Sequence, residues 1–316
     1  MADVKEASIL PSKMLKSGKL EAESSIQDAC MKTFSVMSIN MGGKANVNLR
    51  RQLSTEAISQ FSLSLIFCQE PPHKFEKEVV NKCDDYDLHY DFRITGNEAA
   101  VLWLMKDFEL IELIRPTKIV DELYRKRSDL KVSDVSSRSV LVILKEKGEE
   151  AHGFQPFLAA SWHGPHQGRS KSLKKSTLNG FICVLCEVCK KNGISSFILG
   201  GDFNINTSHY KAHIDTVVVS KYDLTPRAIR KCQESRNYIP YKDNFFVFNE
   251  RSYDGGILQL SSVSALSLKN CKDWLDHDLI VGEFTFGPCK QTGEPFKMFA
   301  SGFIHVVVVY VSWEYT

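Results

Sequence analysis

The chain lacks long hydrophobic segments and a strong net charge of either sign. It contains no run of about 18 consecutive apolar residues, so we expect no membrane-spanning helix. Its first 30 residues contain no basic start followed by a long apolar run, which argues against a secretory signal. The net charge of +2 neither indicates nor excludes a nucleic-acid partner, because basic groups can cluster locally.

The cysteine content favours a reducing compartment. The nine cysteines are an odd number, which predicts reduced thiols and a location in the cytoplasm or nucleus. Cys183, Cys186 and Cys189 have the spacing of a metal-binding run. Zinc would need a fourth ligand, however, and no paired Cys or His motif is placed to supply one. We therefore interpret the three as core residues of a helix.

The composition is that of a globular protein with a sizeable core, since 43% of the 316 residues are apolar and 25% are charged. Residues 1–30 are polar and weakly patterned, and we expect a tail outside the core. Residues 31–286 carry the periodic patterns of one domain. Residues 287–316 form a C-terminal extension whose role the pattern does not indicate.

Hydrophobic periodicity predicts alternating strands and helices between the tail and the extension. The order favours two mixed sheets packed face to face with helices outside. Helices are expected at 47–62 and 172–191, while 73–95 has the pattern of a helix and irregular chain. Strands are expected at 33–39, 63–68, 99–105, 108–114, 139–145, 157–162, 197–199, 245–248 and 279–281.

The stretch from Phe197 to Asn204 ends in Gly-Gly-Asp-Phe-Asn. Its glycines allow a sharp turn or the close approach of another group. If strand pairing continues through Phe203, Asp202 and Asn204 lie on one side and Phe203 on the other. A carboxylate and an amide held together suit the orientation of water or of a metal-bound anion, although the same residues also favour a simple turn.

Further polar residues fall where the predicted strands begin or end. In α/β proteins, strand ends are where sites are built. We therefore expect these side chains to converge on one rim of the domain. They are Asn40, Glu70, Glu98, His163, Asp202, Asn204, Asp243, Asp276 and His277.

Three basic stretches lie outside these strands, at 125–131, 169–175 and 227–236. Each is compatible with a solvated surface or with contacts to a phosphate backbone. If they contact nucleic acid, binding should weaken steeply with salt.

In chain order, the motifs resemble those of the endonuclease/exonuclease/phosphatase superfamily, and the match is closest to its deoxyribonuclease I-like members. The resemblance covers residues 31–286. It implies a four-layer α-β-β-α sandwich and metal-dependent hydrolysis of phosphate esters. The motifs are Ile39-Asn40, Gln69-Glu70, Asn97-Glu98, His163, Gly201-Asp202-Phe203-Asn204, Asp243 and Asp276-His277.

The resemblance also implies a role for each of these side chains. Asn40 and Glu70 would hold a divalent cation, with Asp276 near it. Asp202 and Asn204 would orient the attacking water and the phosphate. His277 would be backed by Asp243, and His163 by Glu98. The His163–Glu98 pair favours a deoxyribonuclease-like or phosphatase-like site, because abasic-site endonucleases of the superfamily typically lack the equivalent histidine.

The chemistry of a phosphate ester is consistent with this set. A hard cation held by oxygen ligands neutralises charge, and Mg²⁺ fits best, followed by Mn²⁺ or Ca²⁺. The first hypothesis is a monomeric Mg²⁺-dependent phosphodiesterase that acts on nucleic acid as a nuclease. The second is a phosphatase or phosphodiesterase acting on inositol phosphates or phospholipid head groups. The third is a catalytically inactive binding module of the same fold.

Overall fold

The structure is a computed structural model. The basic stretch 125–131, the tail before residue 31 and the extension beyond Gly287 lie outside the residues that it describes. The described residues are 32–42, 46–61, 63–84, 88–96, 98–116, 118–119, 122, 135–147, 155–165, 170–205, 222–224, 230–231, 242–250, 257–266, 277 and 279–287.

The first sheet has seven strands in the order β10-β12-β13-β1-β2-β4-β3. It is mixed, because β1 runs parallel to β2 and antiparallel to β13. Its strands are β1 (Lys32–Asn40), β2 (Leu65–Gln69), β3 (Tyr90–Thr95), β4 (Ala99–Leu104), β10 (Arg230–Lys231), β12 (Ile257–Leu266) and β13 (Leu279–Gly287).

The second sheet has six strands in the order β5-β6-β7-β8-β11-β9. It is also mixed, because β7 runs parallel to β8 and antiparallel to β6. Its strands are β5 (Phe108–Ile114), β6 (Ser139–Glu146), β7 (Phe157–His163), β8 (Ser196–Asp202), β9 (Tyr222–Leu224) and β11 (Asp243–Glu250).

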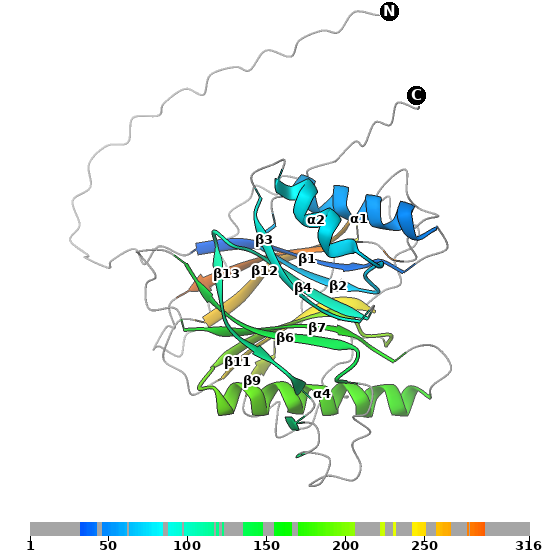
Figure 1. Cartoon of the computed structure of the whole chain (residues 1–316). Helices are drawn as coiled ribbons and strands as arrows, with labels where there is room; N and C mark the ends of the chain where they lie inside the picture. Colours follow the sequence, from blue (N-terminus) through cyan, green and yellow to red (C-terminus); the bar gives the residue numbers. More distant parts are fainter. Residues whose placement is uncertain are drawn as a thin grey trace, which may run out of the picture. The chain divides into compact units, whose positions relative to one another are not determined.

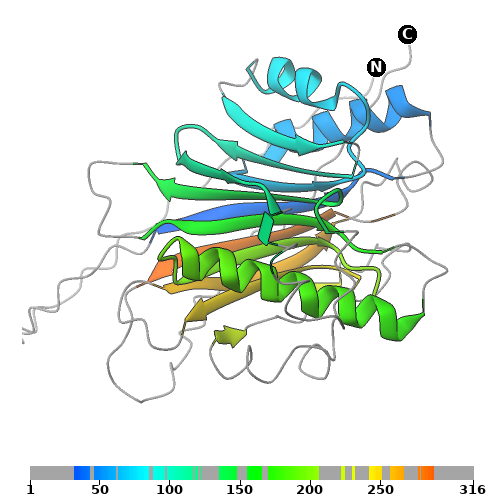
Figure 2. The same cartoon turned by 60° about the horizontal axis from the view of Figure 1, so that its bottom comes forward.

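The two sheets pack face to face between helices. The helices α1 (Val47–Phe61) and α2 (Phe75–Asp84) cover the outer face of the first sheet. The long helix α4 (Lys171–Lys191) covers the outer face of the second sheet (Figures 1 and 2). The predicted α-β-β-α sandwich is thus confirmed. Among the helices described here, none is long and apolar enough to cross a membrane.

Alternation along the strands builds the core between the sheets. Phe34 and Val36 of β1 point inward, as do Val142 of β6 and Ala159 of β7, whereas the residues between them face the helices. Gly200 of β8 is needed here, because a Cβ at this position would lie 2.5 Å from Phe67 Cδ2 of the opposite sheet. A sharp turn and the close approach of another group were the two roles predicted for these glycines. Gly200 has the second role, and it lies within the strand β8.

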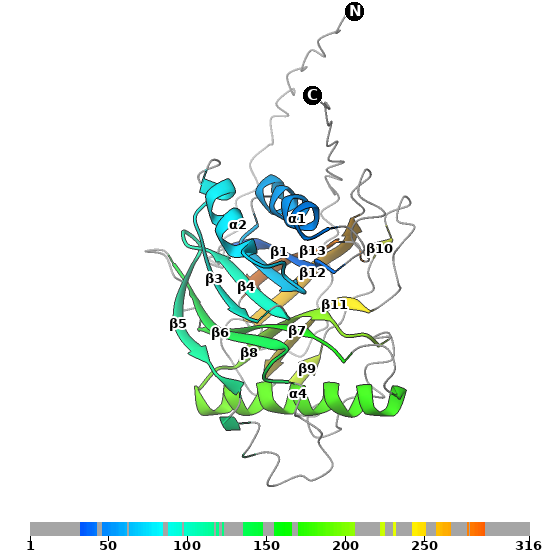
Figure 3. The same cartoon turned by 45° about the vertical axis from the view of Figure 1, so that its right-hand side comes forward.

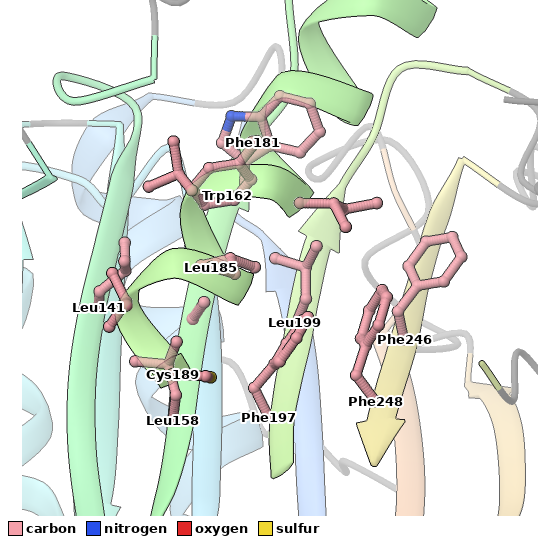
Figure 4. Packing of buried hydrophobic residues seen from close by; sticks show 14 of the residues in the cluster. Leu141, Leu158, Trp162, Phe181, Leu185, Cys189, Phe197, Leu199, Phe246 and Phe248 are labelled. Atoms are coloured by element: carbon pink, nitrogen blue, oxygen red, sulfur yellow. The ribbon is translucent and has the colours of Figure 1, made fainter. Parts of the chain in front are cut away.

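A second core lies between α4 and the second sheet. Trp162 packs on Phe181 of α4 at a ring-centroid distance of 5.0 Å (Figure 4). Cys189 is fully buried in this core, and Cys183 and Cys186 pack against it. The interpretation of the three cysteines as core residues of a helix is thus confirmed. An equivalent core joins α1 and α2 to the first sheet, through residues such as Ile58 and Val79.

Four strands differ from the expectation, the short β9 and β10 and the longer β3 and β12. Residues 90–95 were predicted as irregular chain but form β3, the edge strand that pairs with β4. The strand β12 was not predicted either. Both segments contain alternating apolar and polar residues, as in Tyr90-Asp91-Phe92-Arg93-Ile94, so the strand signal was present. In β3 it was outweighed by the helical pattern of the residues before it.

Candidate functional site

Asn40, His163 and Asp202 continue the inward-facing rows of β1, β7 and β8. Asn40 follows Phe34 and Val36 at the inward positions of β1, and His163 follows Phe157 and Ala159 on β7. Because β1 and β2 are parallel, as are β7 and β8, each pair presents its carboxyl ends at one edge of its sheet. Figure 3 labels β1, β7 and β8, and Figure 1 labels β2. Contacts between the sheets show that both edges belong to the same rim.

A turn after β8 holds Asp202 and Asn204 side by side. Asp202 Oδ1 accepts a hydrogen bond from the Asn204 backbone N–H at 2.8 Å, and Oδ2 accepts one from Asn204 Nδ2 at 3.1 Å. Asn204 has a φ of 52°, a left-handed value that Asn tolerates well. Phe203 is fully buried and packs edge-on against Trp162 at 5.8 Å.

Of the two alternatives for this stretch, a continued strand or a turn, the structure has the turn, and the turn still holds Asp202 and Asn204 side by side. The strand ends at Asp202 rather than continuing through Phe203. A side chain that bonds the backbone two residues later competes with the ladder of the sheet. This local turn brings the two side chains together.

Asp202 also joins the two sheets. Its Oδ2 accepts a hydrogen bond from Asn40 Nδ2 of β1 at 3.1 Å and lies 3.8 Å from His277 Nε2. The Asp202 side chain is only 2% exposed, so its charge is compensated by these donors rather than by bulk water. The carboxylate is held in a single orientation.

His163 lies between two glutamates of the opposite sheet. Its Nδ1 is 2.7 Å from Glu98 Oε2, and its Nε2 is 3.4 Å from Glu70 Oε1. The His163 side chain is fully buried, whereas the two carboxylates are 36% and 35% exposed. A carboxylate at Nδ1 fixes the proton on that nitrogen and orients the ring.

Arg138 supports this histidine, and sequence reasoning missed it. Its Nη1 lies 3.1 Å from Glu98 Oε2. Its Nε and Nη2 donate to the carbonyls of His163 and Gly164 at 2.8 and 2.9 Å. Arg138 directly precedes β6, as Glu98 directly precedes β4, so its place at the start of a strand was the signal that could have found it. The guanidinium geometry satisfies all three acceptors at once.

Glu70 occupies a strained position at the end of β2. Its φ is 50°, which is uncommon for a residue other than glycine and costs energy. Its backbone N–H donates to the Glu98 carbonyl at 3.2 Å, so the two glutamates are also linked through the main chain. Strain of this kind is found where a side chain must point in a particular direction.

Gly42 separates the oxygen atoms of Asn40 and Glu70. The Gly42 N–H donates to Asn40 Oδ1 at 2.8 Å, and a Cβ on Gly42 would lie 2.7 to 2.9 Å from three atoms of the Glu70 carboxylate group. Both residues therefore offer oxygen atoms around one glycine. Oxygen donors of this kind suit Mg²⁺, which is typically held by one or two carboxylates and keeps several waters.

A zinc-type centre is not supported by the described residues. They contain no group of three or more His, Cys, Asp or Glu that could hold a metal ion. Burial raises the pKa of the nearby Cys68 thiol well above its usual value, so the thiol stays protonated and is no thiolate ligand. The oxygen atoms of Asn40 and Glu70 are of the chemical type that a hard cation prefers.

The structure brings together seven of the nine predicted residues, in contacts that link both sheets. They are Asn40, Glu70, Glu98, His163, Asp202, Asn204 and His277. The eighth, Asp243, lies opposite Asp202 in the β8–β11 register, but its side chain is outside the described part. Asp276 falls outside the described residues altogether. The catalytic and metal-binding roles of all nine stay predictions.

Of the basic stretches, the one at 169–175 is the best described. Its Lys174, in the first turn of α4, donates through Nζ to the Asn204 carbonyl at 3.3 Å. This places one ammonium group at the turn that follows Asp202. Most of the stretch at 227–236 lies outside the described residues.

No protein-family model matches the sequence, and no curated protein sequence matches it either. Solved structures do match. An endonuclease/exonuclease/phosphatase protein from Bacteroides vulgatus aligns with a TM-score of 0.56 at 11% identity, covering 81% of this chain and 100% of that one. The chain has the fold of the endonuclease/exonuclease/phosphatase family.

Other structures with this endonuclease/exonuclease/phosphatase fold differ in the substrates that they name. D. rerio TDP2 complexed with a single-strand DNA product aligns with a TM-score of 0.54 at 12% identity, covering 80% of this chain and 98% of that one. The mannosyl-6-phosphatase Bt3783 of Bacteroides thetaiotaomicron aligns with a TM-score of 0.55 at 14% identity, covering 80% and 99%. At these identities the likeness establishes the fold alone.

Proposed function

We propose that this protein is a divalent-metal-dependent hydrolase of phosphate esters, and that its substrate is nucleic acid, cleaved at a phosphodiester bond. The observation that carries the proposal is the contact of Asp202 with Asn40 and His277, next to His163 between two glutamates. This rim combines oxygen ligands for a cation with imidazole groups that can donate to phosphoryl oxygens.

Asn40 and Glu70 would hold the cation, with Asp276 as a further oxygen ligand nearby. Mg²⁺ suits this set best, followed by Mn²⁺ or Ca²⁺. When bound, such a cation neutralises charge on the phosphate and thereby lowers the barrier to attack by an anionic or polarised nucleophile.

The side chains of this protein supply the remaining functions. Asp202 and Asn204 would orient the attacking water. His163, held by Glu98, would donate to the phosphate, and His277 would do the same with Asp243 behind it. Groups that transfer a proton or stabilise charge in this way each contribute about 10²- to 10⁴-fold to the rate.

The nucleic-acid substrate is favoured by the DNA product bound in a protein of the same fold and by Lys174 beside Asn204. The second candidate is a phosphorylated small molecule or lipid head group, since a mannosyl-6-phosphatase shares the fold to a similar degree. We further propose that the protein works as a monomer, and its odd number of cysteines supports a location in the cytoplasm or nucleus.

The test is hydrolysis with Mg²⁺ and with EDTA, using plasmid DNA, RNA, inositol phosphates and bis-p-nitrophenyl phosphate. We expect plasmid nicking that EDTA abolishes. His163→Ala and His277→Ala should lose this activity while their circular dichroism spectra stay native, which also excludes a contaminating nuclease. Near-normal turnover in either variant contradicts the assignment. Chelator-sensitive release of phosphate only from small molecules selects the second candidate, and an inactive wild type supports a binding module.

A further inference from the structure

A buried polar bridge crosses the sandwich directly beneath the site. The Ser161 hydroxyl of β7 donates to the Cys68 carbonyl of β2 at 2.9 Å and accepts from Gln69 Nε2 at 3.2 Å. Ser161 and Gln69 are both fully buried. The single hydroxyl therefore makes two hydrogen bonds from one sheet to the other.

These polar residues occupy positions that hydrophobic residues fill elsewhere. Along the same inward-facing rows, Leu65 and Phe67 precede Gln69, while Phe157 and Ala159 precede Ser161. Apolar contact between the sheets would stabilise this layer equally well, and burial of polar groups carries a desolvation cost. Hydrogen bonds add directionality, because a satisfied buried network allows one relative position of its elements.

The neighbours of the two residues are the reacting groups. Gln69 directly precedes Glu70, and its carbonyl accepts from the Met41 N–H at 2.8 Å, in the turn that follows Asn40. Ser161 lies two residues before His163, which is in register with Asp202. The bridge thus joins the segment that carries Asn40 and Glu70 to the segment that carries His163 and Asp202.

We infer that Gln69 and Ser161 are positioning residues, whose hydrogen bond sets the separation between the Asn40–Glu70 side and the His163–Asp202 side of the site. This inference rests on the proposed function. The bridge aligns His163 and Asp202 with the side chains of the opposite sheet. The proposed cation ligands Asn40 and Glu70 lie together on one side of the bridge, so its loss should not change how they bind the cation.

The variants Ser161→Ala, Gln69→Met and the double variant test this inference, with bis-p-nitrophenyl phosphate and Mg²⁺ as probes. We expect kcat to fall about 10- to 100-fold, because small misplacements of reacting groups have effects of this size. KM and the Mg²⁺ concentration for half-maximal rate should stay within about threefold of wild type. The double variant should be no slower than the slower single variant, because both remove one interaction.

Ser38→Ala is the matched control. Ser38 is buried in the same layer and its hydroxyl donates to Gln69 Oε1 at 3.4 Å, but it lies on β1, within the first sheet. Its kcat should therefore stay within about threefold of wild type. The inference is wrong if Ser38→Ala loses as much activity as Ser161→Ala, if Ser161→Ala keeps wild-type kcat, or if KM and the Mg²⁺ requirement change in proportion to kcat.

A second measurement separates failure of this inference from failure of the proposed function. If wild-type protein hydrolyses none of the probes, the proposed function fails, and ring ¹⁵N signals of labelled histidine then test the bridge alone. We expect a single sharp His163 signal in wild type and in Ser38→Ala, assigned by its loss in His163→Gln. Ser161→Ala should broaden or split it. An unchanged His163 signal in Ser161→Ala overturns the bridge in this case.

Discussion

The two sheets contribute to the rim in different ways. The carboxylates from the first sheet, Glu70 and Glu98, are 35% and 36% exposed, whereas His163 and Asp202 from the second sheet are 0% and 2% exposed. Both buried groups are fixed by several neighbours. The exposed carboxylates reach solvent, where a hydrated cation and a substrate arrive.

This difference suggests that the two sheets have separate roles at the rim. Exposed carboxylates exchange water for a cation at small cost, while buried groups in a drier setting interact more strongly with developing charge. We therefore expect substitutions of the proposed cation ligands of the first sheet, Asn40 and Glu70, to change the metal requirement, and substitutions of the buried groups His163 and Asp202 to change the maximal rate. The predictions below test this contrast.

The largest effect is expected from comparing Asp202→Asn with Glu70→Gln. Asp202→Asn keeps the shape but removes the charge and sets an NH₂ group against the donors of Asn40 and Asn204. We expect kcat to fall about 10³-fold, within the range for groups of this kind, with an unchanged Mg²⁺ requirement. Glu70→Gln should instead raise the Mg²⁺ concentration for half-maximal rate and recover activity at high Mg²⁺. The measurement is the hydrolysis rate of each variant across a Mg²⁺ titration. Identical titration curves for the two variants would show that the two sheets do not have separate roles.

A smaller effect is expected at Arg138. Lysine preserves the charge but cannot reach Glu98 and the carbonyls of His163 and Gly164 together, because its ammonium group lacks the planar fork. Arg138→Lys should lower kcat about tenfold without changing the Mg²⁺ requirement, since a misplaced reacting group has effects of at least this size. Urea unfolding is the control, and it should show a native-like transition. A wild-type kcat in Arg138→Lys shows that Glu98 alone positions His163.

How much of the fold and of the candidate site could be predicted from the sequence depends on how local each sequence signal is. Alternation and strand ends are local patterns, and they were enough to place Asn40, Glu70, His163 and Asp202 on one rim. The layered fold follows from the same periodicity. The sandwich geometry then brings these strand ends together without any further information.

The parts that were missed depend on contacts between distant segments. Arg138 contacts Glu98 and His163, which are 40 and 25 residues away along the chain. The bridge from Gln69 to Ser161 spans 92 residues. In the sequence, a serine or glutamine at the end of an apolar run looks like any strand terminus. These residues gain their hydrogen-bond partners only when the two sheets pack face to face.

The smallest expected effect is that of Gly42→Ala. The new Cβ would lie 2.7 to 2.9 Å from three atoms of the Glu70 carboxylate group, so this half-exposed side chain must move. We expect the Mg²⁺ concentration for half-maximal rate to rise about three- to tenfold, in line with the 10- to 100-fold losses seen when supports of metal ligands are removed. Because no positive φ is recorded for Gly42, the free energy of unfolding should change by less than about 1 kcal/mol.

The Glu70→Gln background tests whether this effect passes through Glu70. If it does, Gly42→Ala should have no further effect on the Mg²⁺ requirement there, since both substitutions disturb one ligand. Additive effects in the double variant would mean that Gly42 acts on the metal by another route, for example through the Asn40 amide that its N–H holds at 2.8 Å. The first-sheet side of the site would then depend on its backbone turn more than on the exposed carboxylate.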